Sequence, residues 1–530
     1  MNISEKILKL RKEKGLSQEA FAEKLGVSRQ SVSKWESSGA LPDIDKIIAM
    51  SELFGVSTDY LLKDEVPEAD VSEEAKAEAD DVNEDNTEYI PAPAEDKPVQ
   101  KKNFALKLTA IFLVIAITVA AIALPAYYGG VKNLWYEANG GVLSYPYVLV
   151  HGLGGWGEGN SINDMTQYWG GGSSDLKKVL EAEGYEVYTP GVGPVSSAWD
   201  RACELYAQLS GTRVDYGEAH SKEHNHSRYG RTYTEPLIAN WGMKMNGGQT
   251  VRINLVGHSF GGATVRLLAS LMEYGSEAEM QAGGDDISPL FTGGKGDYIH
   301  SVTTLCAPHN GSSLTEVLNT LGGTVGITDT TDMLMTLCFG VAGIAAPVEG
   351  VYDFQLDHFG IDKIDPKSAI AAVTASGNDH AAYDLSPDGA AELNKEIKTV
   401  EGIYYFSYAY STTQQGKILG KQVPLTSTLP ILSPFALAMG QYTGTTAGGI
   451  EIDESWQEND GLVNVVSARY PAGEEYMSLP ENPEDISRGI WNVAPKRTGD
   501  HGTVIGLNAK AGKTKEFYME LFTLIDSLER

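Results

Sequence analysis

Residues 256–262 read VGHSFGG and set one serine, Ser259, among glycines. The stretch completes an apolar run, VRINLV (251–256), and leads into a helix-like run. Gly257 and Gly261 give the pattern G-x-S-x-G, in which a sharp turn from strand to helix presents the serine hydroxyl at the end of a sheet. The pattern alone is common, but its position between a strand and a helix favours a nucleophile over an ordinary glycine-rich turn.

Apolar, β-rich runs recur on both sides of this turn and alternate with helix-like patterns. The runs are YVLVHG (147–152), VRINLVGHS (251–259), IHSVTTLCAP (299–308) and GIYYFSYAYS (402–411), and the helical patterns lie at 174–184 and 263–275. Continuous apolar strands that alternate with helices are typical of a parallel sheet covered on both faces. We therefore predict that residues 140–530 form an α/β domain with a mostly parallel central sheet.

A serine nucleophile needs a base, and the base needs an acid to orient it. On a sheet with this serine turn, the three follow in the order Ser, Asp, His. Asp460, in QENDGLVNVVSA (457–468), follows a polar turn and precedes a predicted strand, although Asp453 is an alternative on spacing alone. His501, in TGDHGTVIG, is the only histidine after Asp460. We predict that Ser259, Asp460 and His501 form a catalytic triad.

The negative oxygen that forms during attack needs two backbone N–H donors. Phe260, directly after the nucleophile, is the first candidate. A loop after the first strand is the expected source of the second, and VLVHGLGGWG (148–157) fits, with the N–H of Leu153 as donor. We interpret His151 in this loop as a hydrogen-bonding support rather than as a base.

The C-terminal region, residues 145–530, resembles the large secreted triacylglycerol lipases of the staphylococcal and thermophilic-bacillus type, which have the α/β-hydrolase fold. The stretches that carry the resemblance run in family order and include VLVHGLGGWG (148–157), YWGG (168–171), HNHSRYGRTY (224–233), VGHSFGG (256–262), SVTTLCAPHNGSSL (301–314), VYDFQLDHFG (351–360) and WQENDGLVN (456–464). The resemblance implies an ester lipid substrate and the same triad, and it leaves lipase against short-chain esterase open.

The resemblance also implies a structural zinc ion, because the family's ligand positions are filled by Asp200, His220, His226 and Asp379. Two imidazoles and two carboxylates can complete a tetrahedron around zinc. Without the resemblance, HSKEHNH (220–226) reads as a solvated polar loop. The family's calcium site is not predicted, because Thr503 and Asn508-Ala509 stand where the family has a glutamate and an Asp-Pro pair.

The resemblance further places a lid helix in the region from Leu314 to about Ala346, which includes nearly all of the apolar stretch MLMTLCFGVAGIAAP (333–347). Such a lid covers the acyl pocket and opens onto lipid. The alternative is an ordinary buried helix.

Residues 1–63 carry a different pattern, SQEAFAEKLGVSRQSVSKWESSGALPD (17–43). Ser17 can cap one helix, Gly26 permits a turn, and Ser28 can cap a second helix. The segment resembles the all-α helix-turn-helix domain of phage repressors and Cro. This resemblance implies DNA binding and a possible homodimer on a palindromic site; the alternative is a small helical bundle that binds protein. The predicted DNA contacts are Gln18, Arg29, Gln30, Ser33 and Lys34.

Charge divides the chain further. The net charge is -30, yet residues 1–63 carry ten Lys/Arg and nine Asp/Glu, so this segment can approach DNA. Residues 64–103 are acidic and proline-containing, which predicts a disordered linker.

Within 104–128, the stretch LTAIFLVIAITVAAIALPAYY (108–128) has no charge and predicts a transmembrane helix. Four lysines precede that stretch and only Lys132 follows closely, so the N-terminus should be cytoplasmic.

Together these features predict a membrane-anchored serine hydrolase with a cytoplasmic DNA-binding domain and an extracellular catalytic domain. Its three cysteines do not suggest a disulfide framework. The alternative is a transmembrane transcription regulator whose outer, hydrolase-like domain acts as a sensor.

Overall fold

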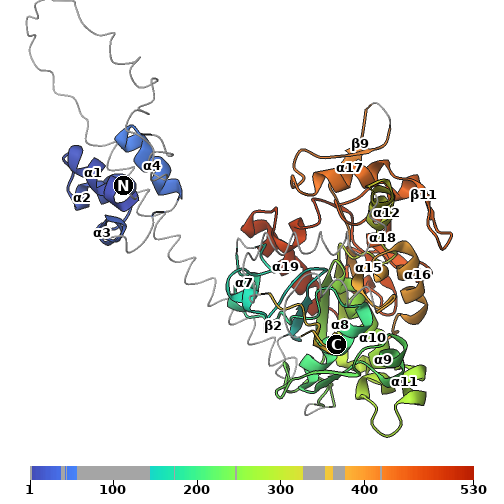
Figure 1. Cartoon of the computed structure of the whole chain (residues 1–530). Helices are drawn as coiled ribbons and strands as arrows, with labels where there is room; N and C mark the ends of the chain where they lie inside the picture. Colours follow the sequence, from blue (N-terminus) through green and yellow to red (C-terminus); the bar gives the residue numbers. More distant parts are fainter. Residues whose placement is uncertain are drawn as a thin grey trace, which may run out of the picture. The chain divides into compact units, whose positions relative to one another are not determined.

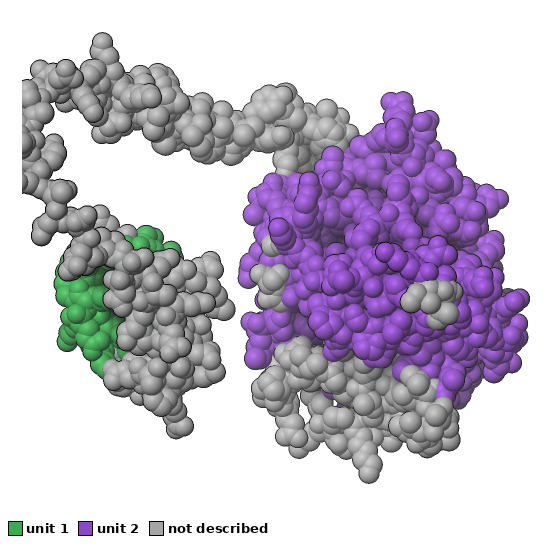
Figure 2. Space-filling view, turned by 90° about the horizontal axis from the view of Figure 1, so that it is seen from above, with its two compact units in different colours: residues 1–119 green, residues 120–530 purple. Residues whose placement is uncertain are grey.

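The computed structural model describes residues 3–36, 42, 44–56, 144–171, 174–244, 248–325, 352–361, 376–417 and 420–529. The chain divides into two compact units, Met1–Val119 and Ala120–Arg530 (Figure 2). The predicted linker at 64–103 and the predicted membrane span at 104–128 lie outside the described residues. Among the helices that the described ranges contain, none is long and apolar enough to cross a membrane.

The N-terminal unit contains four described helices, α1 (Ile3–Glu13), α2 (Gln18–Leu25), α3 (Arg29–Glu36) and α4 (Ile44–Phe54). The predicted caps are present, because Ser17 Oγ accepts the Ala20 N–H at 3.1 Å and Ser28 Oγ accepts the Ser31 N–H at 3.1 Å. The helices enclose a small core of their own that includes Phe21 and Val32. The predicted helix-turn-helix is therefore confirmed in α2 and α3.

The second unit is built on a seven-stranded sheet in which all six neighbouring pairs are parallel. The strands are, in order across the sheet, β13 (Tyr476–Ser478), β14 (Trp491–Val493), β7 (Tyr404–Tyr408), β6 (Ile299–Leu305), β5 (Ile253–His258), β1 (Tyr147–Val150) and β2 (Val187–Tyr188). The four central strands, β7, β6, β5 and β1, coincide with the four apolar runs of the sequence. The predicted α/β fold is confirmed.

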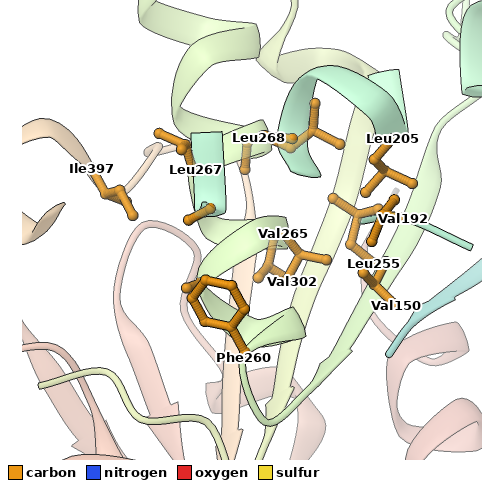
Figure 3. Packing of buried hydrophobic residues seen from close by; sticks show 14 of the residues in the cluster. Val150, Val192, Leu205, Leu255, Phe260, Val265, Leu267, Leu268, Val302 and Ile397 are labelled. Atoms are coloured by element: carbon orange, nitrogen blue, oxygen red, sulfur yellow. The ribbon is translucent and has the colours of Figure 1, made fainter. Parts of the chain in front are cut away.

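Helices cover both faces of this sheet (Figure 1). On β1, Val148 and Val150 belong to one buried cluster, while Tyr147 and Leu149 belong to the other, because successive side chains of a strand point to opposite faces. The first cluster includes residues of α8 (Ala198–Ser210) and α10 (Gly261–Tyr274), and Figure 3 shows it closely. The second includes residues of α7 (Leu176–Ala182) and α19 (Ala511–Asp526).

The remaining helices and small strands surround this core. They are β3 (Arg213–Asp215), α9 (Glu218–Glu223), β4 (Tyr229–Thr232), α11 (Glu277–Ala282), α12 (Ser313–Val325), α15 (Ala381–Asp384), α16 (Pro387–Glu396), β8 (Tyr410–Ser411), β9 (Thr413–Gln415), β10 (Gln422–Pro424), α17 (Ser433–Gln441), β11 (Gly444–Thr445), β12 (Glu451–Ile452), α18 (Val465–Arg469) and β15 (Arg497–Thr498). Helix α12 covers only the start of the predicted lid. Residues 326–351, which include the whole apolar stretch MLMTLCFGVAGIAAP, lie outside the described residues.

Parallel pairing brings the carboxyl ends of β1, β5 and β6 to one edge of the sheet. The chain leaves these strands at His151, Ser259 and Cys306. Ligand and catalytic sites of open parallel sheets lie at this edge, so the predicted nucleophile is placed where such a site is expected.

Candidate active site

The serine turn is held by close backbone packing. β5 ends at His258 and α10 begins at Gly261, and between them Ser259 has φ 56°, a left-handed conformation that is uncommon for a residue with a side chain. A Cβ on Gly257 would lie 2.4 Å from the Gly261 carbonyl oxygen, and a Cβ on Gly261 would lie 2.2 Å from the Val150 carbonyl oxygen. Both flanking positions therefore require glycine, as the G-x-S-x-G pattern indicates.

The predicted acid and base are in contact. The Nδ1 atom of His501 lies 2.8 Å from Oδ2 of Asp460, and the His501 N–H donates to the Asp460 carbonyl at 2.8 Å. The other carboxylate oxygen, Oδ1, accepts the N–H groups of Leu462 at 3.0 Å and Val463 at 2.8 Å. With Nδ1–H donating to the carboxylate, Nε2 of His501 carries the lone pair that a general base needs.

The sequence left Asp453 as an alternative acid, and the structure places it elsewhere. Asp453 is exposed and caps a short 3-10 helix by accepting the Ser455 N–H at 2.9 Å. The residues after Asp460 form the helix α18 rather than the predicted strand. This helix and the residue before it make contacts that the sequence does not show: Ser467 Oγ donates to the Gly311 carbonyl at 2.6 Å, and Asn464 Oδ1 accepts the Ser313 N–H at 2.8 Å.

The loop that carries His501 lies against the end of β5. Nε2 of His258, the residue before Ser259, is 3.0 Å from the His501 carbonyl oxygen, and the two imidazole rings are 4.8 Å apart. The structure therefore brings all three predicted triad residues to the same edge of the sheet.

Two backbone N–H groups at this edge are available to a substrate. The loop after β1 passes directly over the nucleophile, because a Cβ on Gly152 would lie 3.1 Å from Ser259 Oγ. Within the described part of the chain, the N–H groups of Leu153 and Phe260 have no hydrogen-bond acceptor. Phe260 is fully buried, and buried N–H groups without an acceptor are rare, so both predicted donors are in a state that suits an oxyanion.

Buried polar side chains support the oxyanion loop. His151 accepts the Val192 N–H at Nε2 (3.1 Å), and its Nδ1 donates to the Gly152 carbonyl (2.9 Å), as expected for a support. Burial, with the charge of Arg201, lowers the pKa of His151 to about 3, so this imidazole stays neutral. Arg201 donates to the carbonyl oxygens of His151 and Gly193. Arg201 is not among the predicted residues, although an arginine within an apolar helical pattern is a signal for such a buried support.

The four predicted zinc ligands come together although they lie on separate segments. Nε2 of His220 lies 3.3 Å from Asp200 and 3.4 Å from Asp379, and Nε2 of His226 lies 3.3 Å from Asp379. One potential ligand atom of each residue lies within 4.8 Å of all the others. These four atoms are buried and have no hydrogen-bond partner among the described residues, which is the arrangement expected of a site that holds a cation.

Charge in the cluster also suits a cation. Burial raises the pKa of Asp379, but His220 and His226 lower it to a value well below the usual range. Burial lowers the pKa of His220, but the two carboxylates raise it to about 10. A fifth residue, His358, was not predicted; its Nε2 lies 3.1 Å from the second oxygen of Asp200 and orients that carboxylate.

Residues near His501 form hydrogen bonds with a buried carboxylate. Asp500 is buried, and its carboxylate accepts hydrogen bonds from the Thr503 hydroxyl (3.0 Å), the Leu429 N–H (3.0 Å) and the side-chain amide of Asn508. Thr503 and Asn508 occupy positions at which the family that the sequence resembles has calcium ligands. Both side chains donate to the Asp500 carboxylate, and the absence of a calcium site stays a prediction.

The predicted DNA contacts are distributed unevenly. Arg29, Gln30 and Lys34 are exposed on α3, while Val32 and Trp35 of the same helix are buried. Arg29 pairs with Glu19 at 2.8 Å, and both side chains are more than half exposed. Gln18 is half-buried, and its amide donates to Glu36 at 2.8 Å, which fixes α2 against α3. The side chain of Ser33 lies outside the described set.

Comparisons with known proteins agree with the division of the chain into a helical N-terminal unit and an α/β unit. Residues 143–529 match the family model for a lipase-like, C-terminal domain, and residues 7–61 match a helix-turn-helix model. A lipase of Staphylococcus epidermidis is 32% identical over 388 residues, which cover 71% of this chain and 52% of that protein. The chain thus spans about half the length of the curated relatives that it matches.

Two solved structures resemble the same region. Lipase 1 from Pelosinus fermentans is 37% identical with a TM-score of 0.62, and the match covers 73% of this chain and 100% of that one. EstA from Clostridium botulinum is 35% identical with a TM-score of 0.63, and the match covers 73% of this chain and 88% of that one.

Proposed function

The chain belongs, through residues 143–529, to the family of lipase-like C-terminal domains, and from this premise we propose that it is a serine hydrolase of carboxylic esters, of the triacylglycerol lipase type. One observation carries the proposal: the N–H groups of Leu153 and Phe260, which have no acceptor among the described residues, lie at the serine of a left-handed strand-to-helix turn. The names of the relatives support acylglycerols as substrates.

We infer the reaction from the roles that the three predicted side chains would take. Ser259 Oγ attacks the ester carbonyl, and Nε2 of His501 accepts the hydroxyl proton. The oxyanion is stabilised by the N–H groups of Leu153 and Phe260 until the carbon–oxygen bond to the alcohol breaks and His501 returns the proton to the alcohol. Water then releases the acid from Ser259 by the same steps. Throughout, Asp460 stabilises the imidazolium. General-base catalysis contributes about 10²–10⁴-fold, and one oxyanion donor about 10²–10³-fold.

Replacing Ser259 by alanine tests the nucleophile. We expect Ser259→Ala to lower kcat/KM for a p-nitrophenyl ester by at least about 10³-fold, because the covalent step is lost. A fluorophosphonate probe should label the wild type but not the variant. The control is Ser270→Ala on α10, the helix that follows the serine turn, where the buried hydroxyl accepts the Lys398 N–H at 3.0 Å. Substantial turnover by Ser259→Ala would refute the assignment.

The four-residue metal cluster supports a second proposal, that Asp200, His220, His226 and Asp379 bind a structural zinc ion. Two carboxylate oxygens and two imidazole nitrogens match the ligands and the coordination number that zinc prefers. Zinc would tie α8 to α9 and to the segment before α15, which carry these ligands.

Metal removal tests this proposal. Elemental analysis should find one zinc ion per chain, and chelation should lower Tm, because a ligand at 100 times its Kd adds about 2.7 kcal/mol to the free energy of unfolding. Asp379→Asn should abolish the zinc content. His224→Ala should not, because His224 lies in the same loop but its Nδ1 faces the Ser376 carbonyl at 3.4 Å. A chain that contains no zinc and melts unchanged after chelation would exclude the site.

The N-terminal unit supports DNA binding as a further proposal, in which α3 enters the major groove with Arg29, Gln30 and Lys34 exposed. Gln18 and Ser33 complete the proposed contact set. A homodimer of this unit would place two such helices one turn of DNA apart.

A mobility-shift assay tests DNA binding. Residues 1–63 should retard duplex DNA at low salt, and Lys34→Ala should weaken binding and reduce the salt dependence by about one phosphate contact. Lys9→Ala is the matched control, because Lys9 lies on α1 and pairs with Glu13 at 3.8 Å. No retarded species even at low salt would favour the alternative, a helical bundle that binds protein.

We further propose that residues 104–128 cross the cell membrane once, with the DNA-binding unit in the cytoplasm and the hydrolase outside. The absence of charge over 108–128 supports the membrane span, and the lysines before it support this orientation. The full chain should sediment with membranes and resist a carbonate wash, and deletion of 104–128 should release it. In intact cells, a membrane-impermeant fluorophosphonate should label the hydrolase. A full chain recovered in the soluble fraction would contradict the proposal.

The regulator alternative keeps one observation in its favour, the helix-turn-helix unit on the same chain. In that case the outer domain senses a lipid ester without turning it over. A wild-type Ser259 that does not react with the fluorophosphonate, together with intact DNA binding, would support this alternative.

A further inference from the structure

We propose that Tyr168 and His258 are positioning residues that connect the oxyanion loop, the serine turn and the His501 loop through one chain of hydrogen bonds. The effect of these residues on the reaction rate rests on the proposed ester hydrolysis, whereas the hydrogen bonds themselves do not. Neither side chain is part of the predicted triad. We name the three bonds together the Tyr168–His258 relay.

The relay consists of three bonds in series. The Gly152 N–H donates to the Tyr168 hydroxyl oxygen at 3.0 Å, and that hydroxyl lies 2.5 Å from Nδ1 of His258. On the other side of the ring, Nε2 of His258 lies 3.0 Å from the His501 carbonyl oxygen. One end of the relay is therefore the residue before the oxyanion donor Leu153, and the other end is the backbone of the general base.

The donors and acceptors can be assigned without ambiguity. A carbonyl oxygen only accepts, so Nε2 of His258 carries the hydrogen that bonds to His501. The neutral ring then has an acceptor at Nδ1, to which the Tyr168 hydroxyl donates its hydrogen. The same hydroxyl oxygen accepts from Gly152. In this assignment each hydrogen of the relay is donated in one bond, and the assignment requires His258 to be neutral with its hydrogen on Nε2.

Burial supports that neutral form. His258 is buried, and burial lowers its pKa well below the usual value. Burial of the hydroxyl also raises the pKa of Tyr168, so the hydroxyl keeps the proton that it donates. The Tyr168 ring is held in place by edge-on contacts with Trp156 (5.6 Å) and Trp169 (5.4 Å).

His258 cannot itself replace His501 as the base. Both of its ring nitrogens already take part in hydrogen bonds, whereas Nδ1 of His501 is paired with Asp460 and Nε2 is the nitrogen available to a proton. The role left to His258 is to fix distances between loops. A displacement of about 1 Å between reacting groups can cost on the order of 10²-fold in rate, which is why such a support matters.

Removing one hydroxyl tests the relay. We expect Tyr168→Phe to lower kcat about tenfold, the effect of about one hydrogen bond, while KM changes less than about twofold. Affinity for an alkyl boronic acid, which forms a tetrahedral adduct with the serine, should fall in parallel with kcat/KM. The matched control is Tyr518→Phe. The Tyr518 ring is buried beside Trp169, and its hydroxyl has no hydrogen-bond partner among the described residues, so activity should be unchanged.

A double-mutant cycle asks whether the two residues act as one unit. His258→Phe and Tyr168→Phe should each lower kcat, and the double variant should be little worse than the poorer single variant. His258→Gln, which keeps a donor toward the His501 carbonyl, should retain more activity than His258→Phe. Additive losses, or an unchanged kcat in Tyr168→Phe, would overturn the proposal.

Hydrogen–deuterium exchange separates this inference from the proposed function, because it needs no turnover. Tyr168→Phe should speed amide exchange both in residues 151–155 and in the loop that carries His501, with Tm nearly unchanged. Faster exchange confined to the segment around Tyr168 would overturn the relay even in an active enzyme. An inactive wild type that shows the coupled exchange would instead refute only the ester hydrolysis.

Discussion

The close approach of three backbone segments at the serine turn is the constraint on which the catalytic geometry depends. The start of α10 packs so tightly on the end of β1 that a single methyl group on Gly261 would lie 2.2 Å from the Val150 carbonyl oxygen. In the same turn, Ser259 adopts a φ of 56°, which costs on the order of 1–3 kcal/mol and persists because the parallel pairing of β5 with β1 and β6 fixes both sides. The same geometry turns the Phe260 N–H away from any acceptor in the described chain.

Helix α8 joins the cluster of candidate zinc ligands to the loop that carries Leu153. Asp200 contributes a potential ligand, and the next residue, Arg201, donates to the carbonyls of His151 and Gly193. One turn later, Glu204 accepts the Gly193 N–H, and burial raises the pKa of Glu204 to about 7. A zinc ion that fixes α8 would therefore also fix the loop that carries Leu153, so its stabilising effect would reach the catalytic edge through a single rigid element.

The parts of the site that the sequence predicts are those that local patterns determine. The serine turn needs glycines at fixed spacing, and the two capped helices of the N-terminal unit need serines before them. The roles of Ser259, Ser17 and Ser28 can therefore be predicted from the sequence. His501 follows from being the only histidine after Asp460. The relay is different, because Tyr168 and His258 are 90 residues apart and meet only when the sheet forms. The strand predicted after Asp460 is a helix for the same reason: contacts of Ser467 and Asn464 with distant segments outweigh the preference of valines for strands.

Two histidines lie side by side in this site, and their surroundings give them different roles. Their rings are 4.8 Å apart, so a positive charge on His258 would oppose the imidazolium that forms on His501 by about 3.5 kcal/mol at an effective dielectric constant of about 20. A cost of that size corresponds to a rate loss of more than about a hundredfold. Burial lowers the pKa of His258 well below the usual value, which keeps its ring neutral, whereas His501 is paired with the carboxylate of Asp460. The imidazolium of the transition state therefore lies beside the Asp460 carboxylate and a neutral His258 ring, and that ring can serve as a support without a kinetic penalty.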